Sequence, residues 1–355
     1  MRDATQGKAM TVNVGIIGAG MIGQEHGRRL SGAIAGAQVI AISDVDQARA
    51  RSVAATLPGA RVHLTGQDLI RDAKVDAIVV TSWGPTHEEY VLAAIAAGKP
   101  VFCEKPLATT QEACLRILDA EVAFGRRLVQ VGFMRRFDAA YRALKQTIVS
   151  GAIGAPLIFN SVHRNPSVPA TYTSDMALVD TAVHDIDTAR FLLDDEPAAV
   201  SVKSPRRNSR GGALADPLFT LIEMRGGALV TIETSVNIAY GYDIRGEIVG
   251  ETGVATLAES GPIVVKSNGA FSGRVPTDWR ERFGAAFDME LREWLIAAAK
   301  GGATGPSAWD GYVATVVTDA GVMAIKSGER VDVALRERPA LYHPARDPQA
   351  LADVA

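Results

Sequence analysis

Short apolar runs alternate with longer amphipathic stretches over the first third of the chain. The runs are rich in Val and Ile and too short for helices, so they predict buried strands at residues 12–17, 38–43, 75–81, 101–103 and 127–131. The stretches between them carry apolar residues at helical spacing. Strands that alternate with helices predict a parallel, doubly wound sheet that binds its ligand at the carboxyl ends of the strands. We therefore expect a Rossmann-like α/β domain over residues 11–131.

The pattern changes after Gly132. Helical periodicity predicts helices at residues 137–149, 179–193, 286–299 and 310–327. Between residues 156 and 266 a series of strand-like runs is separated by turn signals such as Arg225-Gly226-Gly227, which predicts mostly antiparallel pairing. We expect an α+β domain over residues 132–343, with an open, mostly antiparallel sheet and helices on one side, and loose termini at residues 1–10 and 344–355.

A glycine-rich turn follows the first predicted strand. It runs from Gly18 through Gly20, Met21 and Ile22 to Gly23 and opens a predicted helix. Glycine leaves room for a pyrophosphate over the helix N-terminus, where exposed N–H groups and the helix dipole hold an anion. The strand, turn and helix together favour a dinucleotide site over a structural tight turn.

An acidic residue is expected about 20 positions beyond such a turn, where it accepts from the adenosine ribose. Asp44 stands there, at the end of the second predicted strand. Its carboxylate would repel a 2′-phosphate, and neither Val45 nor Asp46 supplies a cation. NAD is therefore the expected cofactor. NADP remains the alternative, because Arg49 and Arg51 lie nearby, although we expect both on the exposed face of the next helix.

Composition narrows the class of protein. The chain has 355 residues, a formal net charge of −3 and two cysteines. The charge gives no reason to expect a nucleic acid or an anionic membrane as partner. Two cysteines do not suggest a disulfide framework, so a cytoplasmic location is expected. No apolar run approaches the roughly 20 residues of a membrane span, and no His/Cys/Asp spacing suits a metal site.

Two further segments carry groups suited to proton transfer. Lys105 follows a predicted strand of the first domain, so it projects where doubly wound sheets bind ligands. Asp180 and His184 are four residues apart on a predicted helix and would share one face. A carboxylate beside an imidazole orients the ring and tunes it for proton transfer. From position alone, a loop lysine and a helix-surface pair remain equally good interpretations.

These segments together resemble one family. The glycine turn, Glu104-Lys105-Pro106 and the run Asp-Thr-Ala-Val-His-Asp-Ile-Asp from Asp180 to Asp187 are similar to the Gfo/Idh/MocA oxidoreductases. Closer stretches resemble the inositol 2-dehydrogenases within that family: residues 81–88, 163–166, 240–243 and 305–312. The resemblance runs from about residue 12 to residue 342.

The resemblance implies a role for each matching residue. Lys105, Asp180 and His184 match the catalytic lysine, aspartate and histidine, with His184 as the base, Lys105 stabilising negative charge on the substrate oxygen, and Asp180 holding both cations. Further positions would contact the cofactor or the other hydroxyls of a polyol: Thr81, Trp83, Glu104 and Lys105 for NAD, and His163, Asn165 and Tyr242, with Asp180 and His184, for the substrate. Family members are commonly tetramers or dimers, so a homotetramer is expected.

The expected reaction is the NAD-dependent oxidation of a secondary hydroxyl of a cyclic polyol, with myo-inositol giving its 2-keto product. The alternatives are scyllo-inositol or a pyranose sugar at the same site, and a non-enzymatic regulator that senses the dinucleotide. Oxidation needs a neutral His184, so kcat/KM should rise from acid toward mildly alkaline pH. Of the other histidines, we expect His26 on a helix surface. We expect His87, at the start of a helix, to be structural, with a role near the cofactor as the alternative.

Overall fold

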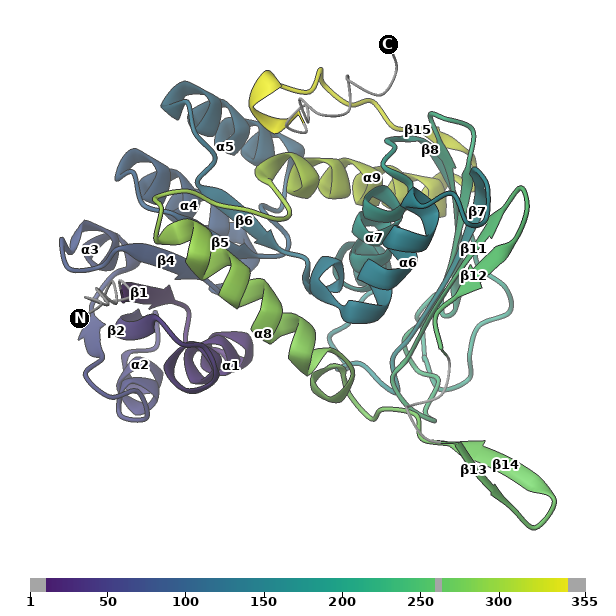
Figure 1. The fold of residues 1–355 in the computed structure, drawn as a ribbon, viewed down its shortest axis with the longest axis horizontal. Helices are drawn as coiled ribbons and strands as arrows, with labels where there is room; N and C mark the ends of the chain where they lie inside the picture. Colours follow the sequence, from purple (N-terminus) through teal and green to yellow (C-terminus); the bar gives the residue numbers. More distant parts are fainter. Residues whose placement is uncertain (1–10, 259–263, 344–355) are drawn as a thin grey trace, which may run out of the picture.

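The computed structural model describes residues 11–258 and 264–343. Figure 1 shows two sheets side by side, each covered by helices, with a small hairpin projecting beyond the second sheet. The predicted loose termini, residues 1–10 and 344–355, lie outside the described residues. No helix within residues 11–258 or 264–343 has both the length and the apolar character that crossing a membrane requires.

The first sheet is the predicted parallel one. Its order is β3-β2-β1-β4-β5-β6, and every neighbouring pair is parallel. The strands are β1 (Val12–Ile17), β2 (Ala37–Ser43), β3 (Arg61–His63), β4 (Ala77–Val80), β5 (Val101–Glu104) and β6 (Val129–Gly132). The helices between them are α1 (Met21–Arg28), α2 (Gln47–Ala54), α3 (Gly66–Arg71), α4 (His87–Ala96) and α5 (Gln111–Phe124). The strand order reverses between β1 and β4, which places a ligand site at their carboxyl ends.

Strands β4, β5 and β6 are buried along their whole length. Layers of helices on both faces of a parallel sheet explain why these strands read as continuous apolar runs rather than as alternating ones. Strand β3 was not predicted, because three residues at the sheet edge, only partly buried, give too little pattern.

The second sheet is mixed, open and mostly antiparallel. Its order is β12-β11-β7-β10-β9-β8-β15. The strands are β7 (Pro156–Arg164), β8 (Pro197–Lys203), β9 (Leu218–Met224), β10 (Leu229–Ser235), β11 (Asp243–Gly250), β12 (Val254–Thr256) and β15 (Val331–Asp332). Helices α6 (Ala139–Val149), α7 (Val183–Leu193) and α9 (Ala308–Ser327) cover one face (Figure 1). The predicted fold class is confirmed.

One detail of the predicted pairing is wrong. The consecutive strands β10 and β11 are not neighbours, because β7 lies between them, parallel to β10 and antiparallel to β11. Side chains alternate within β10: Val230 and Ile232 are buried in the apolar cluster shared with the helices, while Leu229 is 38 % exposed on the other face. Turn signals report that the chain reverses, but not which strand fills the space beside it.

Helix α8 (Trp279–Ala298) follows the second sheet in the sequence but packs on the first. Leu291, Trp294 and Leu295 belong to the same apolar cluster as Val14 of β1 and Phe102 of β5. The remaining elements are the projecting hairpin β13 (Val264–Ser267) and β14 (Ala270–Gly273), and the short turns η1 (Arg29–Ala33), η2 (Gly84–Thr86), η3 (Met134–Phe137), η4 (Ala177–Ala182) and η5 (Ala340–Tyr342). Helix α8 therefore ties the two halves of the chain together.

Candidate active site

The three glycines of the turn after β1 serve three different purposes. Gly18 has φ +101°, a backbone conformation that is strained for any residue with a side chain. A Cβ at Gly23 would lie 2.0 Å from the carbonyl oxygen of Gly18, so glycine there lets α1 approach β1. A Cβ at Gly20 would meet nothing within 4 Å. Gly20 is the N-cap residue of α1 and has no side chain that could accept from the first N–H groups of the helix. These groups therefore face the open space, as the binding of a pyrophosphate requires.

Asp44 sits at the end of β2 and is nearly buried. Its Oδ2 accepts from the amide of Ala19 at 2.6 Å, and its Oδ1 accepts from the amide of Asp46 at 2.8 Å. Each carboxylate oxygen has a further lone pair, so both can still accept from a ribose hydroxyl. Arg49 is half exposed, as expected, yet its Nη1 lies 3.8 Å from Asp44 Oδ2. The guanidinium therefore stands closer to the ribose position than the sequence suggested.

Large apolar side chains around the glycine turn are left uncovered. Met21 is 60 % exposed, Trp83 is 78 % exposed and Val45 is 96 % exposed. Exposed apolar side chains that surround a polar turn are typical of a surface that a ligand covers. Together with the space at Gly20, they fit a dinucleotide laid across the ends of β1, β2 and β4.

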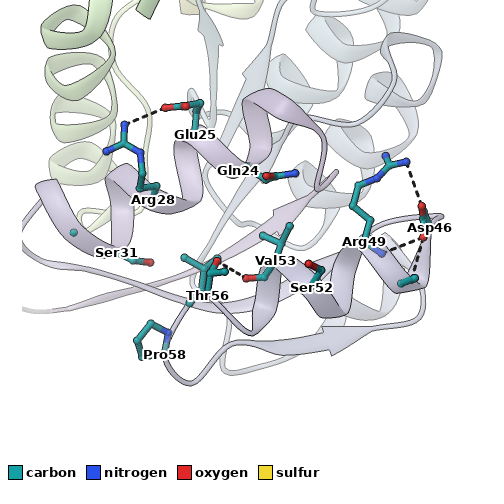
Figure 2. A pocket seen from close by; sticks show the side chains of 13 residues that line it. Gln24, Glu25, Arg28, Ser31, Asp46, Arg49, Ser52, Val53, Thr56 and Pro58 are labelled. Carbon is teal, nitrogen blue, oxygen red and sulfur yellow. Dashed lines mark hydrogen bonds and ion pairs between the residues drawn. The ribbon is translucent and has the colours of Figure 1, made fainter.

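A groove of about 760 Å³ runs between α1 and α2. Figure 2 shows its polar walls, with Gln24 and Arg28 on α1, Ser52 and Thr56 opposite, and Asp46 held to Arg49. The groove contains neither the predicted lysine nor the predicted histidines. The chemistry belongs to a second, smaller cleft.

This cleft, about 480 Å³ in volume, lies between the two domains and gathers most of the predicted site residues. Met21, Ile22, Thr81, Trp83, Glu104 and Lys105 come from the first domain, and His163, Asn165, Asp180, His184 and Tyr242 come from the second. The predicted site residues outside its lining are Gly18, Gly20, Gly23 and Asp44, in the glycine turn and at the end of β2. Segments far apart in the sequence therefore converge at the carboxyl ends of the first sheet.

Lys105 and Asp180 join the two domains across the cleft. Nζ of Lys105 donates to Oδ1 of Asp180 at 2.5 Å and to its carbonyl oxygen at 3.1 Å. The lysine side chain is 18 % exposed and the aspartate side chain is 48 % exposed. An ammonium held at the edge of a cleft in this way can donate to an oxygen that enters it.

His184 lies in the first turn of α7, with its ring partly open to the cleft. The rings of Phe133 and His163 pack against it, with centroids 6.2 Å and 6.4 Å away. Nδ1 is enclosed and has no hydrogen-bond partner among the described residues. Burial lowers the pKa of His184 well below its ordinary value of 6.5, and the charges of Lys105 and Arg135 lower it further. The ring is therefore neutral at pH 7 and able to accept a proton.

The expected contact between Asp180 and His184 is not observed. Asp180 lies in η4, a π-helical turn that precedes α7, so the spacing of four does not run along one α-helix. The hydrogen bonds of its side chain within the described segments go to Lys105. The carboxylate thus holds the ammonium but not the imidazole.

A buried cluster stands behind His163, and the sequence analysis did not predict it. Arg135 Nη1 donates to Asp185 Oδ1 at 2.6 Å, and His163 Nδ1 lies 2.8 Å from Asp185 Oδ2. Burial raises and Arg135 lowers the pKa of Asp185, and the net direction is well below its ordinary value. The only sequence signal is a pair of charged residues, Arg135 and Asp185, within otherwise apolar surroundings. Tyr242 packs edge-on against His163, and Asn165 Nδ2 donates to Thr181 Oγ1 at 3.5 Å.

Two other histidines differ from the expectation or extend it. His26, expected on a surface, is completely buried, and its Nε2 lies 2.7 Å from Oε1 of Glu104. Oε2 of Glu104 accepts from the amide of Lys105, so His26 and Glu104 together hold the backbone of the lysine. His87 bridges the carbonyl oxygens of Ser82 and Pro106 and fixes two loops of the cleft. Over residues 11–258 and 264–343, no group of three or more His, Cys, Asp or Glu side chains could hold a metal ion.

Comparison with known proteins agrees with this geometry. Residues 12–133 match the oxidoreductase family with an NAD-binding Rossmann fold, and residues 141–256 match the GFO/IDH/MocA C-terminal domain. Inositol 2-dehydrogenase 3 of Saccharopolyspora erythraea is 54 % identical over 94 % of this chain and 98 % of its own length. Inositol 2-dehydrogenase of Azotobacter vinelandii is 51 % identical over 95 % and 100 %.

A solved structure is similar over almost the whole fold. Myo-inositol dehydrogenase from Lactobacillus casei, in complex with NAD(H) and myo-inositol, superposes with a TM-score of 0.91 at 37 % identity, over 94 % of this chain and 100 % of that one. The first domain is an NAD-binding Rossmann domain. The chain belongs to the Gfo/Idh/MocA oxidoreductase family.

Proposed function

We propose that the protein is an NAD-dependent dehydrogenase that oxidises a secondary hydroxyl of a cyclic polyol, with myo-inositol giving its 2-keto product. The observation that carries this proposal is the convergence of Lys105 from the first domain with Asp180 and His184 from the second, beside the glycine turn. The inositol dehydrogenases among its relatives, at 54 % and 51 % identity, support the choice of substrate.

The residues that would hold NAD form one continuous surface. The N–H groups after Gly20 face the pyrophosphate position, Asp44 faces the ribose, and Trp83 and Met21 supply apolar cover. Thr81, Ile22 and Glu104 continue this surface into the cleft, toward Lys105. Bound NAD supplies the hydride acceptor.

The proton of the reacting hydroxyl goes to His184, which burial keeps neutral at pH 7. Lys105 donates a hydrogen bond to the same oxygen and stabilises the negative charge that develops there. Asp180 orients the ammonium through the bond to its Oδ1. The side chains of His163, Asn165 and Tyr242 bind hydroxyls that do not react.

The proposal includes a quaternary state and a location: the protein forms a homotetramer and is located in the cytoplasm. The face of the second sheet opposite its helices carries half-exposed apolar residues, with Phe219 at 46 % and Leu229 at 38 % exposure. Such a face is suited to pairing between subunits.

Steady-state oxidation rates over a panel of polyols, with NAD and with NADP, test the proposed activity. We expect the highest kcat/KM with myo-inositol and NAD. Faster oxidation of scyllo-inositol would move the assignment to that isomer. Equal or higher kcat/KM with aldoses such as glucose would overturn the inositol assignment. A protein that binds NAD but oxidises none of the panel would instead be a regulator.

A further inference from the structure

A buried ionic cluster lies behind the part of the cleft proposed to bind the unreactive hydroxyls. It comprises Arg135, Ser161, His163 and Asp185, whose exposures are 1 %, 2 %, 3 % and 0 %. Of these four, His163 alone lines the cleft. The other three can therefore influence a ligand only through the histidine.

Two groups of the cluster, Asp185 and Arg135, lie within hydrogen-bond distance of the same atom, Nδ1 of His163. Oδ1 of Asp185 accepts from Arg135 Nη1 and from Ser161 Oγ, both at 2.6 Å. Oδ2 has a single hydrogen-bond neighbour among the described residues, Nδ1 of His163, at 2.8 Å. Nη2 of Arg135 lies 2.9 Å from the same Nδ1. A ring nitrogen carries either a hydrogen or a lone pair, so Nδ1 cannot both donate to Asp185 and accept from Arg135.

The two arrangements differ in what they leave unpaired. If Nδ1 accepts from Arg135, its lone pair faces Oδ2, and a completely buried carboxylate oxygen loses its donor. If Nδ1 carries the hydrogen, both oxygens of Asp185 are paired, while Arg135 keeps its bond to Oδ1 and interacts with the phenol of Tyr242. An unpaired buried carboxylate oxygen is the more costly defect. The hydrogen therefore belongs on Nδ1.

We propose that Arg135 and Asp185 are positioning residues that hold His163 as the neutral Nδ1–H tautomer, so that its bare Nε2 accepts a hydrogen bond from an unreactive substrate hydroxyl. Nδ1 points into the cluster, so the opposite edge of the ring turns Nε2 toward the cleft. Burial lowers the pKa of His163, which keeps the ring neutral at pH 7. The ligand in this proposal rests on the proposed function, but the tautomer is a property of the free protein.

The consequence is selection at one ring position of the substrate. A hydroxyl can donate to a bare Nε2, whereas an ether or keto oxygen cannot. His163 would then favour a free hydroxyl at that position over a methylated or oxidised one. The buried Asp185 decides this selectivity without touching the ligand.

Nitrogen-15 NMR of the histidine-labelled wild-type protein without ligand tests the tautomer directly. The His163 signals can be assigned by their loss in His163→Gln. We expect a protonated Nδ1 and a bare Nε2 between pH 6.5 and 8. A hydrogen on Nε2, or on both nitrogens, in that range would overturn the proposal. The result does not depend on catalytic activity, so the proposed function and this inference can fail separately.

Variants of the cluster supply the functional readout. In Asp185→Asn the amide donates to Nδ1 and moves the hydrogen to Nε2, so KM for myo-inositol should rise roughly tenfold to a hundredfold, with a smaller change in kcat and an unchanged KM for NAD. Asp187→Asn is the matched control, because Asp187 is equally buried on α7 but pairs with Arg136, and the His163 tautomer should persist.

Ser161→Ala keeps the test valid if Asp185→Asn does not fold. It removes the bond to Oδ1 and the longer contact, 3.5 Å, with the carbonyl oxygen of Arg245, but leaves Oδ2 and Nδ1 untouched. It should therefore keep the Nδ1–H tautomer with a near wild-type KM. An Asp185→Asn protein with the wild-type tautomer and KM would contradict the positioning role. A His163 tautomer in Ser161→Ala that differs from the wild-type one would also contradict it.

Discussion

The two domains present opposite kinds of surface to their ligands. The first offers mainly backbone, in a glycine turn and the free N-terminus of α1, together with one carboxylate at the end of β2. The second offers side chains held by buried charges, as in the Arg135–Asp185–His163 cluster. Backbone recognition is encoded within a few consecutive residues, whereas the charged clusters are assembled from distant segments.

The expected effects of mutation therefore differ between the two domains. Changes in the first domain should alter NAD affinity or local packing, and changes in the second should alter substrate affinity. Lys105 and Asp180 are where the two domains meet, so changes there should affect catalysis itself.

Replacement of Lys105 should have the largest effect. In Lys105→Met the reacting oxygen loses its donor, and kcat with myo-inositol should fall roughly a thousandfold or more, while NAD still binds. Steady-state rates and NAD titration measure the two properties. Lys300→Met, at an exposed position just beyond the C-terminal end of α8, is the control and should keep wild-type kcat. A Lys105→Met protein with wild-type kcat would contradict the assignment of Lys105 as a catalytic residue.

Two glycines of the same turn should fail in different ways. A side chain at Gly20 enters open space, so Gly20→Val should fold normally and raise KM for NAD about tenfold to a hundredfold by blocking the pyrophosphate. A Cβ at Gly23 meets the Gly18 carbonyl at 2.0 Å, so Gly23→Ala should lower the free energy of unfolding by about 1–3 kcal/mol. Thermal denaturation without NAD separates them. Equal loss of Tm in both variants would mean that Gly20 is purely structural.

The pH profile distinguishes a buried base from an exposed one. The sequence alone predicts that kcat/KM rises from acid toward mildly alkaline pH, but burial lowers the pKa of His184 well below its ordinary value of 6.5. Because the neutral ring is the active form, activity limited by His184 should be constant above pH 6.5. It should fall about tenfold per pH unit only below the lowered pKa. A limb centred above pH 6.5 would contradict His184 as the base in this environment.

The smallest expected effect concerns the choice of cofactor. Asp44→Asn keeps an acceptor for the amide of Ala19 but removes the charge that repels a 2′-phosphate. It also removes one of the two ion pairs of Arg49, which keeps its pair with Asp46. The ratio of kcat/KM for NADP to that for NAD should rise about tenfold. Asp46→Asn is the matched control, because Asp46 also pairs with Arg49 but caps α2 instead of bonding to Ala19. A similar shift in both variants would assign discrimination to Arg49 rather than to Asp44.

The same contrast explains what the sequence could predict. Strand β1 begins and ends at the predicted residues, 12 and 17, because an apolar run is a local property. The position of β7 between β10 and β11, and the return of α8 to the first sheet, depend on packing between distant segments. The glycine turn could also be predicted, because it is encoded by consecutive residues.

The site divides along the same line. Lys105 was found because it ends a strand, and Asp180 and His184 because of their spacing, but the spacing misled about their contact. Arg135 and Asp185 are 50 residues apart, and His26 and Glu104 are 78 apart. No local pattern marks such pairs, so their burial appears only in three dimensions.

The most direct test of the account is a crystal structure of the protein with NAD and myo-inositol bound together. We expect Nζ of Lys105 and a ring nitrogen of His184 to lie within about 3 Å of one and the same hydroxyl oxygen, on the ring carbon that faces C4 of the nicotinamide. If the ammonium and the imidazole contact different hydroxyls, or if neither contacts the oxygen on that carbon, the proposed mechanism is wrong.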